Sequence, residues 1–200
     1  MNKKRIIIIS GLSISIIFIL FFSINYKTQK FGNNISKTTD DIVDNILNLS
    51  SYEASLDVTV ESNKTTNKYK IKQIYSKPNI IKQIIEEPNN LENLTILYDG
   101  KDMKLENTKL SLSKIYEEYE YISQNTLWLS SFIDNYSNDS KITETDSKII
   151  IENENIYNNY NIRQELYIDK HSGLPSELKI YDNNKNAKIY IKYNEIKLNM

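Results

Sequence analysis

The 200-residue sequence has no cysteine, a single histidine, four glycines and three prolines. Without cysteine, disulfides, thiolate zinc sites, cysteine nucleophiles and iron–sulfur ligation are excluded. One histidine excludes a metal site built from several histidines. The glycines at positions 11, 32, 100 and 173 are too far apart for a P-loop or a G-x-G-x-x-G loop. These absences argue against an enzyme and predict neither a cofactor nor a metal centre.

The sequence also lacks an excess of either positive or negative charge. The formal net charge is −1 at pH 7, with 25 basic and 26 acidic side chains. A nucleic-acid-binding domain usually carries a clear basic excess. We therefore expect no nucleic acid partner.

A long apolar run stands at the N-terminus, from Ile6 to Ile24, directly after Lys3, Lys4 and Arg5. As a helix it would be about 28 Å long at ~1.5 Å per residue, close to the ~30 Å hydrocarbon core of a membrane. The basic cluster predicts a cytoplasmic N-terminus and an exported remainder. The run exceeds the roughly 7–15 residues of a signal-peptide core, and no small-residue cleavage site follows it. We expect an uncleaved signal anchor; the alternative is a cleaved signal peptide.

Three regions follow from this pattern: residues 1–26 as cytoplasmic tip and signal anchor, residues 27–37 as a polar linker, and residues 38–200 as an extracytoplasmic domain. The domain begins with a predicted helix over 39–49. Ile42, Ile46 and Leu49 fall on one face of this helix, and Thr38 or Thr39 can cap it.

Strands dominate the rest of the domain. Residues 52–60 alternate strictly between apolar and polar, which is typical of a half-buried strand. Asp99-Gly100 between two apolar runs indicates a tight hairpin. The predicted strands cover 52–60, 69–75, 80–87, 94–98, 101–105, 148–152, 164–169, 174–181 and 188–198. Two short helices are expected between them, over 113–122 and from Asn125 or Thr126 to about Tyr136, and a loop over 153–161.

This order of elements predicts an α+β fold. A curved antiparallel sheet, an incomplete barrel, would carry helices packed in its concave face, behind the N-terminal transmembrane helix. Such a face offers an apolar concavity for a lipid or a partner segment.

Two segments resemble the LolA/LppX-like lipoprotein-carrier superfamily. They are the strand–DG–strand unit LTILYDGKDMKL (94–105) and the strand–turn–strand unit ELYIDKHSGLPSELKIYD (165–182). The resemblance implies an incomplete antiparallel barrel plugged by helices, which agrees with the pattern above.

Three further segments resemble the clostridial germination lipoprotein family, GerS: NKYKIKQIYSKPN (67–79), LYDGKDMKLENTKLSLSKIYE (97–117) and LWLSSFI (127–133). That resemblance implies a non-enzymatic spore-envelope protein that binds and activates a spore-cortex N-acetylmuramoyl-alanine amidase, a step needed for germination. This chain departs from the family pattern because it has no lipidation cysteine, so a membrane anchor would replace the lipid.

Tyr116, Tyr119, Tyr121 and Trp128 are the candidate partner-binding residues. Aromatic side chains are enriched at interfaces, but they serve equally as core residues beneath a curved sheet. Both interpretations stay open for these four residues.

Two other features attract a functional hypothesis. His171 could act as a base, although its place beside Gly173 favours an exposed turn residue. Glu117, Glu118 and Glu120 could bind a cation or a basic partner, although their spacing fits no EF-hand and favours a solvated face.

Two alternatives accompany the amidase hypothesis. The first is a lipid or lipoprotein carrier, or a sensor, that uses the apolar concave face. The second concerns assembly: an incomplete barrel leaves an open sheet edge, which predicts a homodimer by strand exchange.

Overall fold

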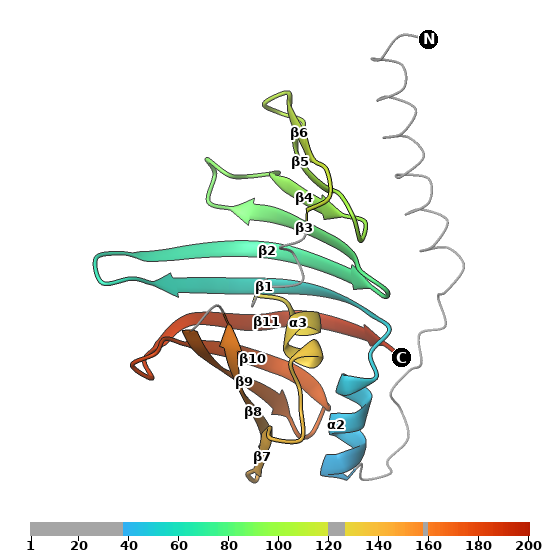
Figure 1. The fold of residues 1–200 in the computed structure, drawn as a ribbon, viewed down its shortest axis with the longest axis vertical. Helices are drawn as coiled ribbons and strands as arrows, with labels where there is room; N and C mark the ends of the chain where they lie inside the picture. The colour runs from blue at the N-terminus through green and yellow to red at the C-terminus, as the bar shows by residue number, and fades with distance from the viewer. Residues whose placement is uncertain (1–37, 120–126, 158–159) are drawn as a thin grey trace. The chain divides into compact units, whose positions relative to one another are not determined.

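The computed structural model describes residues 38–119, 127–157 and 160–200. They form one eleven-stranded sheet in which every neighbouring pair is antiparallel, in the order β6-β5-β4-β3-β2-β1-β11-β10-β9-β8-β7 (Figure 1). The strands are β1 (Ser51–Glu61), β2 (Thr66–Ser76), β3 (Ile80–Glu87), β4 (Thr95–Tyr98), β5 (Met103–Asn107), β6 (Leu112–Tyr116), β7 (Lys141–Glu144), β8 (Lys148–Tyr157), β9 (Tyr160–Asp169), β10 (Leu174–Tyr181) and β11 (Ala187–Asn199).

The alternation of apolar and polar residues in β1 gives the strand one buried face, as predicted. Tyr52, Ala54, Leu56 and Val58 are buried on one face, and the polar residues between them are half-buried on the other. Because side chains alternate along every strand, antiparallel pairing carries this division across the whole sheet. We call the face that holds the buried residues and the two helices the concave face.

Strand β11, the last in the sequence, pairs with β1, the first, in the middle of the sheet. The register runs from Ser51 opposite Asn199 to Val60 opposite Ile189, with a bulge at Ser55/Leu56. The hairpins on either side, β2–β6 and β7–β10, therefore meet through strands from opposite ends of the domain.

Helix α2 (Thr39–Leu47) begins at a capping box. The Asp41 amide donates to Thr38 Oγ1 (3.1 Å), and the Thr38 amide donates to Asp41 Oδ2 (3.0 Å). Ile42 and Ile46 are buried against the sheet, as the apolar spacing predicts, and so is Val43. The helix ends at Leu47, before the predicted end at residue 49, and Leu49 is buried just beyond it.

Helix α3 (Leu129–Asp134) is short and has no side-chain cap at its N-terminus. Side-chain amides hold the helix through other groups, mainly its backbone carbonyls. Asn153 donates to the carbonyl of Phe132 (3.1 Å), and Asn135 donates to Gln164 (3.5 Å). Gln73 donates to the Leu127 carbonyl (3.3 Å), just before the helix. These buried amides explain how a six-residue helix is held on an apolar face.

The predicted class of an antiparallel sheet with helices on one face is confirmed, with three local corrections. Residues 112–116 form strand β6, where a helix over 113–122 was expected; pairing with β5 prevails over the helical spacing of a few apolar residues. The expected loop over 153–161 is largely strand, because β8 and β9 pair along their full length. Strand β7 was not expected at all.

The proposed signal anchor lies outside the described residues. Within the described ranges, no helix has the length and apolar character that a membrane crossing requires.

Candidate partner-binding surface

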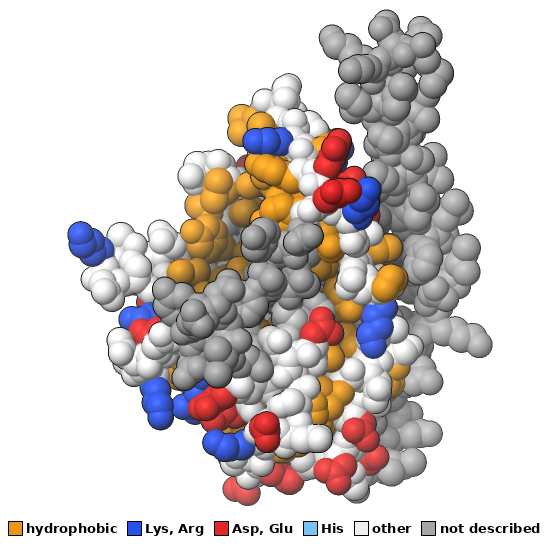
Figure 2. Space-filling view, in the orientation of Figure 1, with side chains coloured by type: hydrophobic (Ala, Val, Ile, Leu, Met, Phe, Trp, Pro, Cys, Tyr) orange, Lys and Arg blue, Asp and Glu red, His pale blue; other side chains and the backbone are white. Residues whose placement is uncertain are grey.

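The concave face differs between its two halves. Helices α2 and α3 pack on the half built from β1 and β7–β11. On β3–β6, Ile96, Tyr98, Met103 and Leu105 stay half-exposed although they point to the same face. Figure 2 shows hydrophobic side chains gathered over these strands.

An apolar row crosses four strands here. Strand register places Ile81 opposite Tyr98, Tyr98 opposite Met103, and Met103 opposite Tyr116. The Tyr119 ring continues the row, with its centroid 6.1 Å from that of Tyr116. We call Tyr98, Met103, Tyr116 and Tyr119 the tyrosine row. A row of half-exposed aromatic and thioether side chains on a rigid sheet is well suited to contact an apolar partner.

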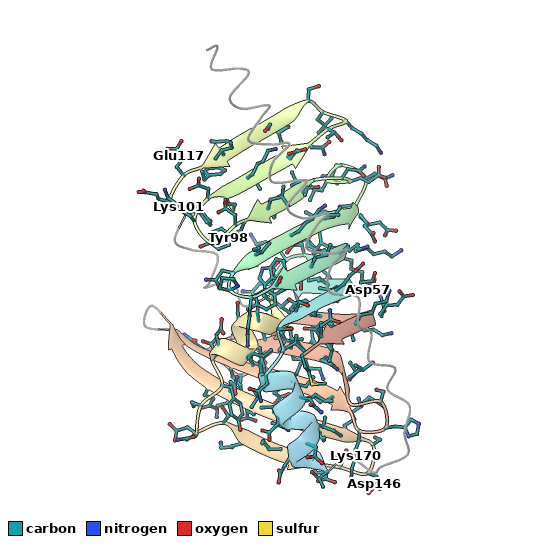
Figure 3. The ribbon with its side chains drawn as sticks, turned by 90° about the vertical axis from the view of Figure 1, so that its right-hand side faces the viewer. Asp57, Tyr98, Lys101, Glu117, Asp146 and Lys170 are labelled. Carbon is teal, nitrogen blue, oxygen red and sulfur yellow. The ribbon has the colours of Figure 1, made fainter. Side chains whose placement is uncertain are left out.

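The chain after β6 is fixed beside this row. The Tyr119 amide donates to the Lys101 carbonyl (2.8 Å), and the Glu118 amide donates to Asp102 Oδ1 (2.9 Å). The predicted hairpin at Asp99-Gly100 is confirmed, but its turn covers residues 99–102, because β4 ends at Tyr98 and β5 begins at Met103. Asp99 Oδ1 accepts the amides of Lys101 and Asp102, and Gly100 has a φ of +98°. Tyr98, Lys101 and Glu117 lie at the same end of the strands (Figure 3).

The candidate partner-binding residues that the structure describes lie in two different environments. Tyr116 and Tyr119 are half-exposed and adjacent. Trp128 is 1% exposed and belongs to the core, so the core interpretation applies to it. Tyr121 lies outside the described residues.

In the described part of the acidic cluster, and at His171, the side chains are exposed. Glu117 and Glu118 are exposed, with Glu118 3.8 Å from Lys101 Nζ, and Glu120 lies outside the described residues. His171 is exposed in a turn where the Gly173 amide donates to the Asp169 carbonyl (2.8 Å). Among the described residues, no group of acids or histidines is arranged to hold a metal ion.

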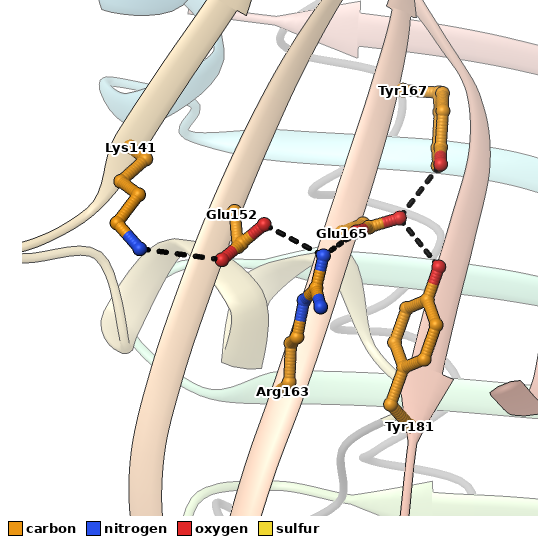
Figure 4. A network of polar contacts seen from close by, with 6 residues as sticks. All are labelled: Lys141, Glu152, Arg163, Glu165, Tyr167 and Tyr181. Carbon is orange, nitrogen blue, oxygen red and sulfur yellow. Dashed lines mark hydrogen bonds and ion pairs between the residues drawn. The ribbon is translucent and has the colours of Figure 1, made fainter. Parts of the chain in front are cut away.

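A polar cluster that the sequence did not predict lies on the opposite, convex face (Figure 4). Glu165, whose side chain is 9% exposed, accepts hydrogen bonds from the hydroxyls of Tyr167 and Tyr181, each at 2.6 Å, and pairs with Arg163. Arg163 also bonds Glu152 at 2.8 Å. The i, i+2 spacing of Arg163, Glu165 and Tyr167 on one strand face was the signal that could have revealed it.

The cluster keeps Glu165 ionised. Burial raises the pKa of this carboxyl, but the two tyrosine hydroxyls and Arg163 outweigh burial, so the pKa lies below its usual value of 4.5. Burial and Glu165 together raise the pKa of Tyr167 to about 12. A carboxylate saturated in this way stabilises the sheet and is poorly suited to donate a proton.

The comparison with family models decides the relationship. The model described as sporulation protein YdcC-like matches residues 3–200. The chain belongs to the YdcC-like sporulation protein family. No curated protein matches this YdcC-like chain.

Solved structures similar to the YdcC-like chain include the two groups that its motifs resemble. The GerS lipoprotein of Clostridioides difficile, solved with the CwlD amidase, is 21% identical (82% of this chain, 98% of that chain, TM-score 0.49). A LolA superfamily protein from Nitrosomonas europaea is 12% identical (82% and 94%, TM-score 0.42). The Mycobacterium tuberculosis lipoprotein LppX is 9% identical (76% and 91%, TM-score 0.43).

Proposed function

We propose that this YdcC-like chain is a non-enzymatic binding protein that holds and activates a cell-wall amidase during spore-cortex modification. Membership of a sporulation family supports a role in spore formation. The amidase as partner rests on the three ordered segments that resemble the germination lipoprotein family. This resemblance in sequence is the observation that carries the proposal.

The second of those segments carries most of the tyrosine row. Residues 67–79 lie in and after β2, residues 97–117 run from β4 to the end of β6, and residues 127–133 enter α3. Tyr98, Met103 and Tyr116 thus belong to the second segment. We place the amidase contact on the tyrosine row because it is apolar, half-exposed and built on paired strands.

Co-purification tests the proposal. The tagged full chain, isolated from sporulating cells, should retain an N-acetylmuramoyl-alanine amidase identified by mass spectrometry. Changing Tyr116 and Tyr119 to alanine should weaken amidase binding about tenfold or more, the effect expected for central aromatic contacts.

Tyr190→Ala is the matched control. Tyr190 is also half-buried, but its position opposite Thr59 places it on the convex face. Equal losses in both variants would contradict the placement of the contact. An amidase that never co-purifies would contradict the function itself.

The N-terminal run from Ile6 to Ile24 completes the proposal as a membrane anchor. It would keep the N-terminus in the cytoplasm and the domain on the extracytoplasmic side of the spore envelope. Carbonate extraction of membranes should leave the full chain in the pellet, whereas release into the supernatant would contradict anchoring.

The half-exposed apolar row also favours one second candidate, a lipid or lipoprotein carrier. Lipid analysis of the same purified material separates the two. Stoichiometric acyl chains without a protein partner would support the carrier, and an amidase without lipid would support the proposal above.

A further inference from the structure

One charged side chain stands among the apolar residues beside the tyrosine row. Lys114 lies in β6 two residues before Tyr116, so both side chains point to the concave face. Strand register sets Lys114 opposite Leu105 of β5, next to the pair that Met103 and Tyr116 form on this face. The other concave-facing residues of β4, β5 and β6, strands that are described throughout, are all uncharged: Ile96, Tyr98, Met103, Leu105, Asn107, Leu112 and Tyr116.

The Lys114 ammonium has no carboxylate partner among the residues that the structure describes. Lys104, on the other face of the same strands, pairs with Glu106. Lys114 Nζ instead lies 4.7 Å from the centroid of the Tyr116 ring. The Lys114 side chain is exposed, so water solvates its charge and the ammonium can accept a partner from outside the chain.

A protein that docks on the tyrosine row changes the surroundings of this ammonium. Because Nζ lies against the ring of Tyr116, a surface that covers Tyr116 also removes water from Nζ. Removing water from an ammonium lowers the affinity unless an acceptor takes the place of the water. A carboxylate gives the stronger, charge-assisted kind of hydrogen bond to an ammonium. A wholly apolar partner would therefore bind less tightly here because of Lys114.

We propose that Lys114 pairs with a carboxylate of the amidase, one that is surrounded by the apolar side chains that cover the tyrosine row. This inference rests on the proposed function and adds the chemistry of the partner's surface: an apolar patch that contains an aspartate or a glutamate. Contact with the apolar row supplies affinity, and the ion pair selects which patch binds and in which orientation.

Two substitutions of Lys114 test the pairing. The tagged full chain is isolated in mild detergent from sporulating cells, and mass spectrometry measures the retained amidase relative to the tagged chain. Lys114→Met keeps an unbranched apolar side chain but removes the charge, and it should lower the retained amidase about tenfold or more. Lys114→Glu opposes two carboxylates and should lower it about tenfold further.

Lys68→Glu is the matched control. Lys68 is also an exposed lysine in a strand, but its position opposite Thr59 places it on the convex face. This variant should retain as much amidase as the unchanged chain does. A loss equal to that of Lys114→Glu would contradict the proposal, because net charge alone would then explain the effect. Far-UV circular dichroism confirms that each variant folds.

The sign of the change separates the alternatives. More amidase on Lys114→Met would show that an apolar surface covers Lys114, and more amidase on Lys114→Glu would show a basic surface; either result would overturn the proposal. Unchanged retention in both variants would overturn it and leave the amidase as partner. An unchanged chain that retains no amidase, or an acidic lipid in its place, would overturn this inference and the proposed function together.

Discussion

At the scale of single residues, two buried side-chain amides serve the packing of α3. Gln73 and Asn153 are each 1% exposed. Their side-chain amides donate hydrogen bonds to the backbone carbonyls of Leu127, just before α3, and of Phe132 within it. A buried carbonyl without a hydrogen-bond donor costs free energy of unfolding, so each of these amides stabilises the folded domain by satisfying one.

Asn153→Ala should lower the free energy of unfolding by about 1–3 kcal/mol. The substitution removes the 3.1 Å hydrogen bond to the Phe132 carbonyl and leaves that carbonyl buried and unpaired. Urea denaturation measures the loss. Asn184→Ala, in an exposed turn, should stay within about 0.5 kcal/mol of the unchanged chain. An equal loss in both variants would contradict the role of Asn153.

Glu165 makes stability depend on pH. Its folded pKa is lowered, so its contribution is present above the usual value of 4.5 and is lost as the pH falls through the lower folded value. Glu165→Gln should therefore lose less stability than the unchanged chain between about pH 5 and pH 3. Denaturation series at several pH values measure the slopes. Equal slopes in the two proteins would contradict this role of Glu165.

At the scale of elements, the sequence pattern predicted a strand correctly where a neighbouring strand also pairs with that segment. The predicted strands over 80–87 and 174–181 match β3 and β10 at both ends. The helix predicted over 113–122 was wrong for residues 112–116. Ile115 and Tyr119 have helical spacing, but β5 pairs with this segment along its full length. A short segment takes the structure its neighbours provide, since helix formation is marginal at this length.

The start of α2 is a local signal that can be tested. Thr38→Ala removes the side-chain acceptor of the Asp41 amide and should lower the free energy of unfolding by about 1 kcal/mol. Thr38→Ser keeps the acceptor and should retain most of the stability. Thermal unfolding of the two variants checks the difference, and equal midpoints would show that the cap contributes nothing.

At the scale of the whole domain, the pairing of β1 with β11 makes the two groups of hairpins depend on one another. Residues from both groups share a single core, including Ile71 and Tyr75 on one side and Leu166 and Leu178 on the other. Neither group can bury its concave face alone, so the domain should unfold as a unit.

Trp128 reports on this cooperativity. It is the only tryptophan and lies in the shared core, 1% exposed. Its fluorescence and the far-UV circular dichroism of the sheet should follow the same urea transition. A dichroism signal that persists after the fluorescence has changed would show that one group of hairpins survives without the other.

The sequence by itself excluded cysteine-based sites, multi-histidine metal sites and glycine-rich phosphate loops, predicted that strands dominate, and showed which face is apolar in strands such as β1. These follow from composition and from a period of two, which are local properties of the chain. It also supplied the motifs by which the chain resembles germination and lipoprotein-carrier proteins.

Only the tertiary structure decided how residues far apart share a face. It placed Trp128 in the core and left Tyr116 and Tyr119 half-exposed, although all three looked alike as candidates. It assembled the Glu165 cluster from β8, β9 and β10 and placed β6 at one edge of the sheet. The reason is physical: burial and pairing depend on which strand lies alongside, and register between distant segments is not a local property of the chain.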